Sequence, residues 1–135
     1  MISKCSLIVR TYECDSYGHV NNANYLHYLE FARHEFLKHV GFDYPAMIKA
    51  GYGVYVARIE INYKMPAFTD DKLDISSWSI KKGAVSGVIA QEIRRGDDLL
   101  IDAKVTWAFV DSKGMPTKLP PLWDVPGLKP DKTCK

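Results

Sequence analysis

The chain has 135 residues, which suits one domain with a sizeable core and would make two independent domains cramped. Apolar residues make up 47% and charged residues 25%, an ordinary balance for a globular protein, and the formal net charge is only +2. Lysine and arginine are scattered, with only Lys81-Lys82 and Arg94-Arg95 adjacent. A charge this weak and dispersed does not predict a nucleic-acid partner.

No apolar run approaches the roughly 18 residues that span a bilayer, and the first residues lead directly into a strand pattern. We therefore expect neither export nor a stable membrane anchor. The three cysteines, Cys5, Cys14 and Cys134, are odd in number and lack the spacing of metal ligands. This usage is typical of a reducing compartment and predicts a cytoplasmic protein.

The first half of the chain predicts one strand and one long helix. Residues 5–13 carry Leu7 and Val9 on one parity and Ile8 and Tyr12 on the other, so we expect a strand with both faces at least partly covered. This strand would deliver Asp15 at its end. A helix is predicted from Asn22 or Asn24 to Val40, with asparagine as the N-cap. Its apolar residues recur at helical spacing: Tyr25, Tyr28, Leu29, Ala32, Phe36 and Val40. An apolar arc this wide requires other elements to wrap around the helix.

The second half predicts four strands in succession, after a short helical turn over residues 43–50. The strand patterns cover residues 53–65, 72–81, 84–95 and 99–110. The predicted order is one strand, one long helix and then four linked strands. This order predicts an α+β fold, with an antiparallel five-stranded sheet curled around one long helix.

The last part of the sequence carries five prolines after residue 114, and it predicts a segment that lies extended on the surface or stays loose. We therefore place the domain at residues 1–121 and a proline-containing C-terminal tail at residues 122–135.

The run from Asp15 to Tyr25 is the candidate functional site. It combines a carboxylate, an imidazole at His19, side-chain amides, and the unpaired N–H groups of a helix start. Asp, Asn and Gly are also ordinary turn and N-cap residues, so a purely structural role for Asp15 stays open on local spacing alone.

The motif Asp15-x-x-Gly18-x-Val20-x-x-Ala23-Asn24-Tyr25, together with the order of elements, resembles the hotdog-fold acyl-CoA thioesterases of the 4-hydroxybenzoyl-CoA thioesterase type. This type includes the YbgC-like and long-chain acyl-CoA branches. The segment 61–67, followed by Asp70-Asp71-Lys72-Leu73, is similar to the second signature of the family. His19 departs from the 4-hydroxybenzoyl-CoA enzymes, which are apolar there, and is closer to the long-chain branch and to plant acyl-carrier-protein thioesterases.

The resemblance implies hydrolysis of an acyl-CoA thioester to a carboxylic acid and free CoA, without a cofactor or a metal. Asp15 would act as nucleophile or general base, and the backbone N–H of Asn22 would bind the oxyanion. His19 would orient water or the thioester. Gly18 and Tyr25 would lie at the substrate. Family members pair their sheets with sites at the subunit junction, so we expect a homodimer or a homotetramer.

Other readings of the same residues stay open. Cys14 is an alternative nucleophile, but a neighbour of Asp15 in a strand would face away from the site. His27, Glu30 and His34 have helical spacing that a metal could use, although no zinc-protease motif occurs. The alternative functions are a non-catalytic acyl or acyl-CoA binding module, an acyl-carrier-protein thioesterase, and a hotdog hydratase or dehydratase.

Overall fold

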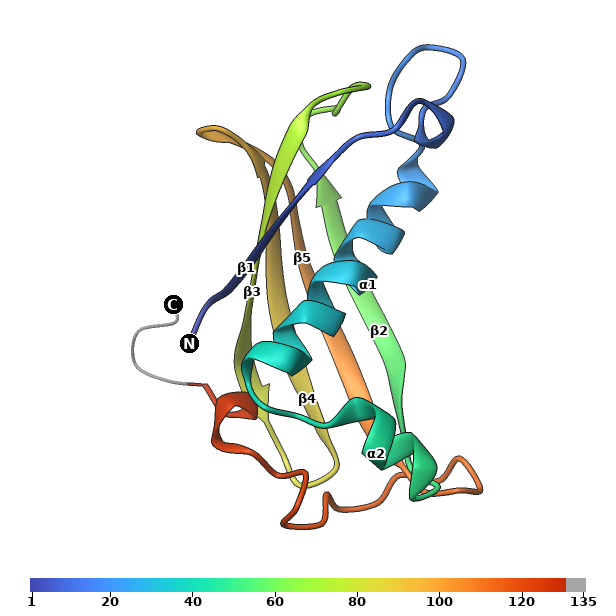
Figure 1. The fold of residues 1–135 in the computed structure, drawn as a ribbon, viewed down its shortest axis with the longest axis vertical. Helices are drawn as coiled ribbons and strands as arrows, with labels where there is room; N and C mark the ends of the chain where they lie inside the picture. The colour runs from blue at the N-terminus through green and yellow to red at the C-terminus, as the bar shows by residue number, and fades with distance from the viewer. Residues whose placement is uncertain (131–135) are drawn as a thin grey trace.

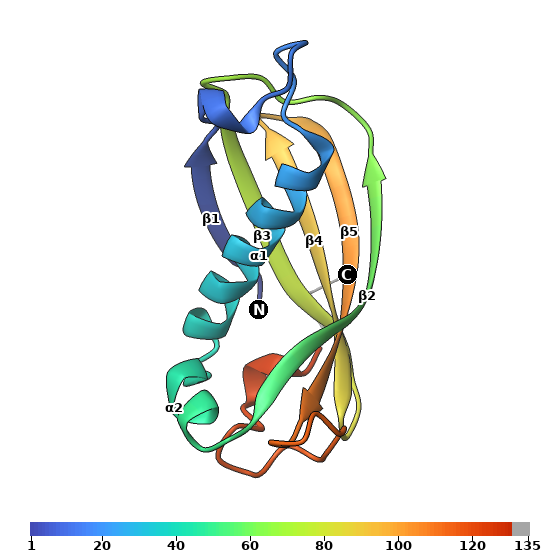
Figure 2. The same cartoon turned by 90° about the vertical axis from the view of Figure 1, so that its right-hand side faces the viewer.

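The computed structural model describes residues 1–130, which form one antiparallel sheet curved around a long helix (Figures 1 and 2). The sheet has the strand order β1-β3-β4-β5-β2. The strands are β1 (Ser3–Ile8), β2 (Gly53–Tyr63), β3 (Lys72–Lys82), β4 (Ser86–Arg95) and β5 (Asp98–Val110). The helices are α1 (Asn22–His39) and α2 (Tyr44–Lys49), with 3₁₀ turns at Thr11–Glu13 and Pro126–Leu128. The predicted α+β fold, with five antiparallel strands wrapped around one long helix, is confirmed.

Helix α1 begins and ends at polar signals in the sequence. The side chain of Asn21 caps it, because Asn21 Oδ1 accepts a hydrogen bond of 2.9 Å from the N–H of Ala23. After Val40 the chain turns at Gly41, whose φ of +77° is a conformation that glycine adopts without strain. No helix within residues 1–130 is long and apolar enough to cross a membrane.

The buried face of α1 is the stripe that the sequence predicts except for Val40, which is the C-cap of the helix and is only partly buried. Its buried residues are Tyr25, Tyr28, Leu29, Ala32 and Phe36. They pack against the inner face of the sheet, where Leu73, Ile75 and Ile93 are almost fully buried. Each such side chain stabilises the fold by about 1.5–3 kcal/mol, so this layer is the main part of the core.

The helix does not cover the sheet evenly. It packs on β1 and β3, whereas β2 lies at the opposite edge of the sheet (Figure 2). Most of β2 is exposed, including the apolar residues Tyr55, Val56 and Ile59. Within residues 1–130, the long edge strand β2 therefore pairs on one side only, with β5, and its outer edge has no strand beside it.

The first strand is shorter than predicted. Strand β1 ends at Ile8, and the chain then forms the 3₁₀ turn at Thr11–Glu13, so the expected strand over residues 5–13 is wrong at its end. The turn forms because the carboxylate of Glu13 accepts hydrogen bonds from the backbone N–H of Arg10 (2.8 Å) and from the Arg10 guanidinium (2.7 Å). Asp15 therefore follows a turn and does not come directly off the strand.

The predicted loose or surface tail is also wrong for residues 122–128. Trp123 and Leu128 are buried, with exposed fractions of 7% and 3%, in a second core cluster around Phe36 and Phe109. The Ser79 hydroxyl donates to the carbonyl of Leu128 at 2.6 Å, which fixes the segment to β3. The division after residue 121 stays a prediction, and Cys134 lies outside the described residues.

Replacing Trp123 with alanine tests this packing. Because the indole is buried beside Tyr52, with ring centroids 5.5 Å apart, we expect Trp123→Ala to lower the free energy of unfolding by about 3–5 kcal/mol. Chemical denaturation monitored by circular dichroism measures the change. The neighbouring Leu122 is 74% exposed and provides the control. Equal effects of Leu122→Ala and Trp123→Ala would show that the segment does not pack as described.

Candidate functional site

A cleft of about 680 Å³ opens where α1 begins and β2 ends. Figure 1 shows the tip of β2 and the first turn of α1 at the same end of the molecule. One wall contains the sequence-predicted residues Asp15, His19, Asn21, Asn22 and Tyr25. The other wall consists of the last residue of β2 and the three residues that follow it: Tyr63, Lys64, Met65 and Pro66. Gly18 is not part of either wall.

The loop that carries Asp15 is tightly hydrogen-bonded to itself. The N–H of Asp15 donates to the carbonyl of His19 at 2.7 Å, and the N–H of Gly18 donates to the carbonyl of Asp15 at 3.0 Å. Gly18 has φ +79°, so its role here is to close the loop. Asp15 Oδ1 accepts from the N–H of Tyr17 at 2.9 Å. Because Asn21 caps the helix, the reading of Asp15 as the N-cap is wrong.

The start of α1 leaves one backbone donor unpaired beside the cleft. The N–H groups of Ala23 and Asn24 donate to the side chain and the carbonyl of Asn21. Within residues 1–130, the N–H of Asn22 has no acceptor. The carbonyl of Asn22 accepts from the Tyr63 hydroxyl at 3.2 Å, which ties the end of β2 to this turn. An unpaired amide at the positive end of a helix is suited to hold an oxyanion.

Tyr25 anchors the opposite wall of the cleft. Its hydroxyl accepts a hydrogen bond of 2.9 Å from the N–H of Ala67, and its ring packs edge-on against Tyr63. Burial raises the pKa of the Tyr25 phenol, so the group is neutral near pH 7. Tyr25 therefore fixes the segment after β2 while its side chain lines the cleft.

His19 lies beside the same segment. Its imidazole packs edge-on against the ring of Phe68, with centroids 5.0 Å apart. Neither ring nitrogen has a hydrogen-bond partner within residues 1–130. The imidazole is thus held in place by an aromatic contact while its nitrogens stay available to a ligand.

Sequence reasoning missed Glu13, a residue of the site region that does not line the cleft, as well as the wall residues after β2. Its carboxylate is buried and also accepts from the Tyr28 hydroxyl at 2.9 Å. Its carbonyl accepts from the N–H of Asn21 (2.9 Å) and the side-chain amide of Asn24 (3.1 Å). Glu13 thereby connects the turn before Asp15 to the start of the helix. The i, i+3 spacing of Arg10 and Glu13 is the one signal in the sequence that could have revealed it.

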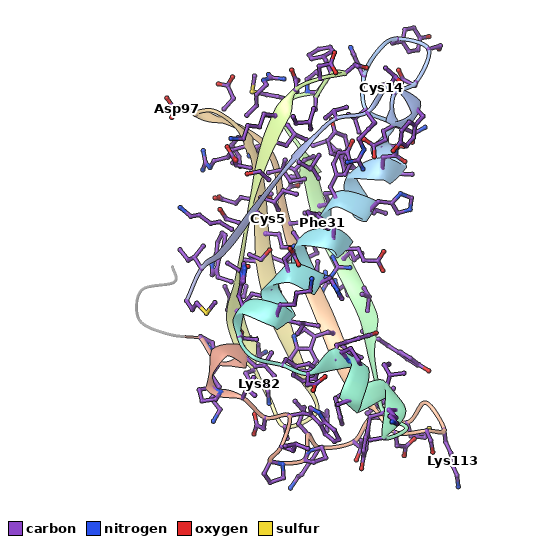
Figure 3. All side chains as sticks on the ribbon, viewed as in Figure 1. Cys5, Cys14, Phe31, Lys82, Asp97 and Lys113 are labelled. Carbon is purple, nitrogen blue, oxygen red and sulfur yellow. The ribbon has the colours of Figure 1, made fainter. Side chains whose placement is uncertain are left out.

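The remaining candidates lie away from the cleft. Cys14 Sγ is 3.2 Å from the hydroxyl of Thr69, and Cys14 is not among the residues that line the cleft. Figure 3 labels Cys14 at the end of the molecule where α1 begins. Within residues 1–130 there is no group of three histidine, cysteine or acidic side chains that could hold a metal ion.

The chain matches the family model of the thioesterase-like superfamily over residues 9–125. It belongs to this superfamily. Among curated relatives, it is 36% identical to the long-chain acyl-CoA thioesterase FadM of Escherichia coli over 107 residues, which cover 78% of the chain and 80% of FadM. It is 32% identical to the E. coli acyl-CoA thioester hydrolase YbgC over 116 residues, or 83% of the chain and 87% of YbgC.

The solved structures agree with the family. A probable thioesterase from Bartonella henselae superposes with a TM-score of 0.85 and 28% identity, over 89% of this chain and all of that protein. The hotdog fold expected from the sequence is therefore confirmed.

Glu13→Gln tests the connection between the turn and the helix. The new amide keeps one oxygen acceptor but places N–H groups against donors from Arg10 or Tyr28. We expect the free energy of unfolding to fall by about 1–3 kcal/mol, the cost of leaving buried polar groups unpaired. Thermal and urea denaturation measure it. Glu92→Gln is the control, because Glu92 forms a partly exposed ion pair with Arg94. We expect it to change the free energy of unfolding by less than about 1 kcal/mol. A Glu13 variant as stable as the control would rule out this role.

Proposed function

We propose that the chain is an acyl-CoA thioesterase that hydrolyses an acyl-CoA to a carboxylic acid and free CoA. The observation that carries the proposal is that one cleft contains both the Asp15 carboxylate and Asn22, whose backbone N–H is unpaired. Hydrolysis needs both: a group that delivers the attacking oxygen and a donor for the carbonyl oxygen as it gains charge. Membership of the thioesterase-like superfamily, and the names of FadM and YbgC, support the choice of an acyl-CoA.

Asp15 has two possible roles, and both fit its position. As a general base it takes a proton from water while the water oxygen attacks the thioester carbon; the C–S bond then breaks and the sulfur leaves with a proton. As a nucleophile it attacks the same carbon, forms an anhydride as the thiol leaves, and water then hydrolyses the anhydride. Asp15 Oδ2, which has no partner within residues 1–130, is the oxygen available for either role.

The oxyanion is bound by the helix start. The N–H of Asn22 donates to the carbonyl oxygen, and the macrodipole of the 18-residue helix α1 favours negative charge at this end. In other hydrolases the loss of one such donor costs about 3–4 kcal/mol of the activation free energy. His19 orients the water or the thioester. Gly18 shapes the loop, and Tyr25 forms the wall against which the substrate lies.

The proposal includes an assembly of at least two chains. Strand β2 is 11 residues long and exposes apolar side chains, whereas the other edge strand, β1, has 6 residues and is covered in part by α1. A long, apolar, unpaired edge is a template for pairing with a second copy. Pairing β2 with β2 gives a homodimer, with the cleft at the end of β2 close to the junction, and further association of dimers gives a homotetramer.

A non-catalytic binding module is the second candidate. One Asp15 oxygen already accepts a hydrogen bond from Tyr17, as expected of a residue that only shapes its loop. The same cleft would then hold an acyl-CoA or an acyl carrier protein thioester without cleaving it. Measured turnover distinguishes this candidate from the thioesterase.

Asp15→Asn tests the catalytic proposal. Asparagine keeps the shape and the acceptor for Tyr17 but removes the base and nucleophile, so the loop should persist. We expect release of free thiol from short, long and aromatic acyl-CoAs to fall by about 10²-fold to 10⁴-fold. Cys14→Ser, one residue away and outside the cleft, should keep the wild-type rate. Equal rates for Asp15→Asn and wild type would remove Asp15 from the mechanism, and tight acyl-CoA binding without turnover would favour the binding module.

Ile59→Lys tests the junction. The side chain of Ile59 lies exposed on β2, so a lysine there would bring two like charges to a β2–β2 pair and should shift the protein to monomers. Light scattering at micromolar concentration measures the mass. Ile8→Lys, on the exposed end of β1, is the control and should leave the assembly intact. A wild-type monomer, or dissociation only by Ile8→Lys, would contradict the β2 junction.

A further inference from the structure

A second cavity lies between residues 27–37 of α1 and the strands β4, β5 and β2. Its volume is about 510 Å³, within the range of small-molecule sites. Its apolar wall is formed by Val54, Val56, Ile89, Trp107, Leu119 and Leu128. It shares no wall residue with the cleft that contains Asp15. Arg33, which lines this cavity, lies eleven residues after Asn22 in the same helix. At a rise of about 1.5 Å per residue, the two residues are about 16 Å apart along the helix axis.

The helix wall carries one guanidinium in a fixed position. Arg33 Nη1 donates to Gln91 Oε1 at 3.2 Å. Gln91 is almost fully buried, and its amide nitrogen donates to the carbonyl of Leu29 (3.0 Å) and the hydroxyl of Ser77 (2.9 Å). Because both N–H groups of Gln91 are used, its oxygen must face Arg33. The arginine is therefore held by a neutral side chain whose orientation is set by the core.

The charge of Arg33 has no acidic partner in direct contact. Within residues 1–130, no carboxylate forms an ion pair with its guanidinium, and Gln91 accepts one hydrogen bond from its five N–H donors. Burial lowers the pKa of Arg33, while the charge of Glu30, one turn earlier, acts in the opposite direction. The result is a partly desolvated cation with unused donors at the wall of an apolar cavity.

We propose that this cavity binds a free monocarboxylic acid with an apolar body. The carboxylate accepts two parallel hydrogen bonds from the Arg33 guanidinium, a geometry that matches the planar fork of arginine. The body lies against Trp107, Ile89 and the other apolar wall residues, where its burial adds to the affinity. A neutral ligand would leave the cation uncompensated, and a strongly hydrated dianion would find only one arginine to balance its two charges.

The acid belongs to the same chemical class as the product of the proposed hydrolysis. The cavity would then hold product at a place separate from the cleft of the same chain. This link to the reaction rests on the proposed function, whereas the binding itself does not. Glu30 also lines the cavity and opposes an anion there, so its charge sets how tightly the acid is held.

Titration calorimetry of the full chain with decanoate tests the site, with 1-decanol as the uncharged probe. We expect saturable binding of decanoate to the wild type and a loss of about tenfold or more in Arg33→Met, with decanol binding unchanged. Arg94→Met removes an equal charge from the outer side of the sheet and should bind decanoate as the wild type does. Equal decanoate affinity in Arg33→Met and wild type, or no saturable binding to the wild type, would overturn the proposal.

Two further variants keep the result decisive. Leu37→Trp fills the cavity and keeps the charge, so it should abolish decanoate binding even if Arg33→Met does not fold. Asp15→Asn should bind decanoate as the wild type does, whether or not the chain hydrolyses thioesters. Loss of binding in Asp15→Asn, with none in Arg33→Met or Leu37→Trp, would place the acid in the cleft and overturn the second site.

Discussion

The structure depends on burying one face of α1. Five large or close-packed side chains of that helix are withdrawn from water, and the sheet must curve to cover them. The curvature brings β1 and β3 against the helix and leaves β2 at the far edge. The cleft at the start of α1 and the cavity farther along the helix are each lined in part by residues of β2, on this less covered side. The same constraint therefore produces the core, the exposed edge and the two cavities.

Polar anchors then fix the end of the helix where the candidate chemistry lies. Glu13 joins the preceding turn to Asn21 and Asn24, and the Tyr25 hydroxyl holds the segment after β2 at Ala67. These bonds are mostly buried, so breaking one leaves a donor or acceptor without water to replace it. A helix start held in this way keeps its free amide at one place, which the proposed stabilisation of a developing charge would require.

Local sequence patterns were enough to predict the helix, its buried stripe and the run of candidate residues from Asp15 to Tyr25. These features depend on neighbours within a few turns, where periodicity and capping act. The patterns could not place Tyr63 and Pro66 on the opposite wall, because that contact depends on how the sheet curves. Trp123 was missed for a related reason: its proline-rich surroundings suggested a surface segment, although the indole fills the open end of the core. Gln91 fixes Arg33 only once the helix lies over β4.

The two cavities differ in what they can hold because different physical effects supply their positive potential. At the start of α1 the donors are backbone amides whose partial charges add along the helix, which suits an oxygen that gains charge only briefly. At Arg33 the charge is a full cation surrounded by apolar side chains, which suits a permanent anion with an apolar body.

A strand that pairs with its own copy must run antiparallel, so the first half of β2 faces the second half of its partner. In the proposed dimer the Val54 and Val56 wall of one cavity therefore lies toward the cleft of the other chain, which would place substrate and carboxylic acid on neighbouring surfaces.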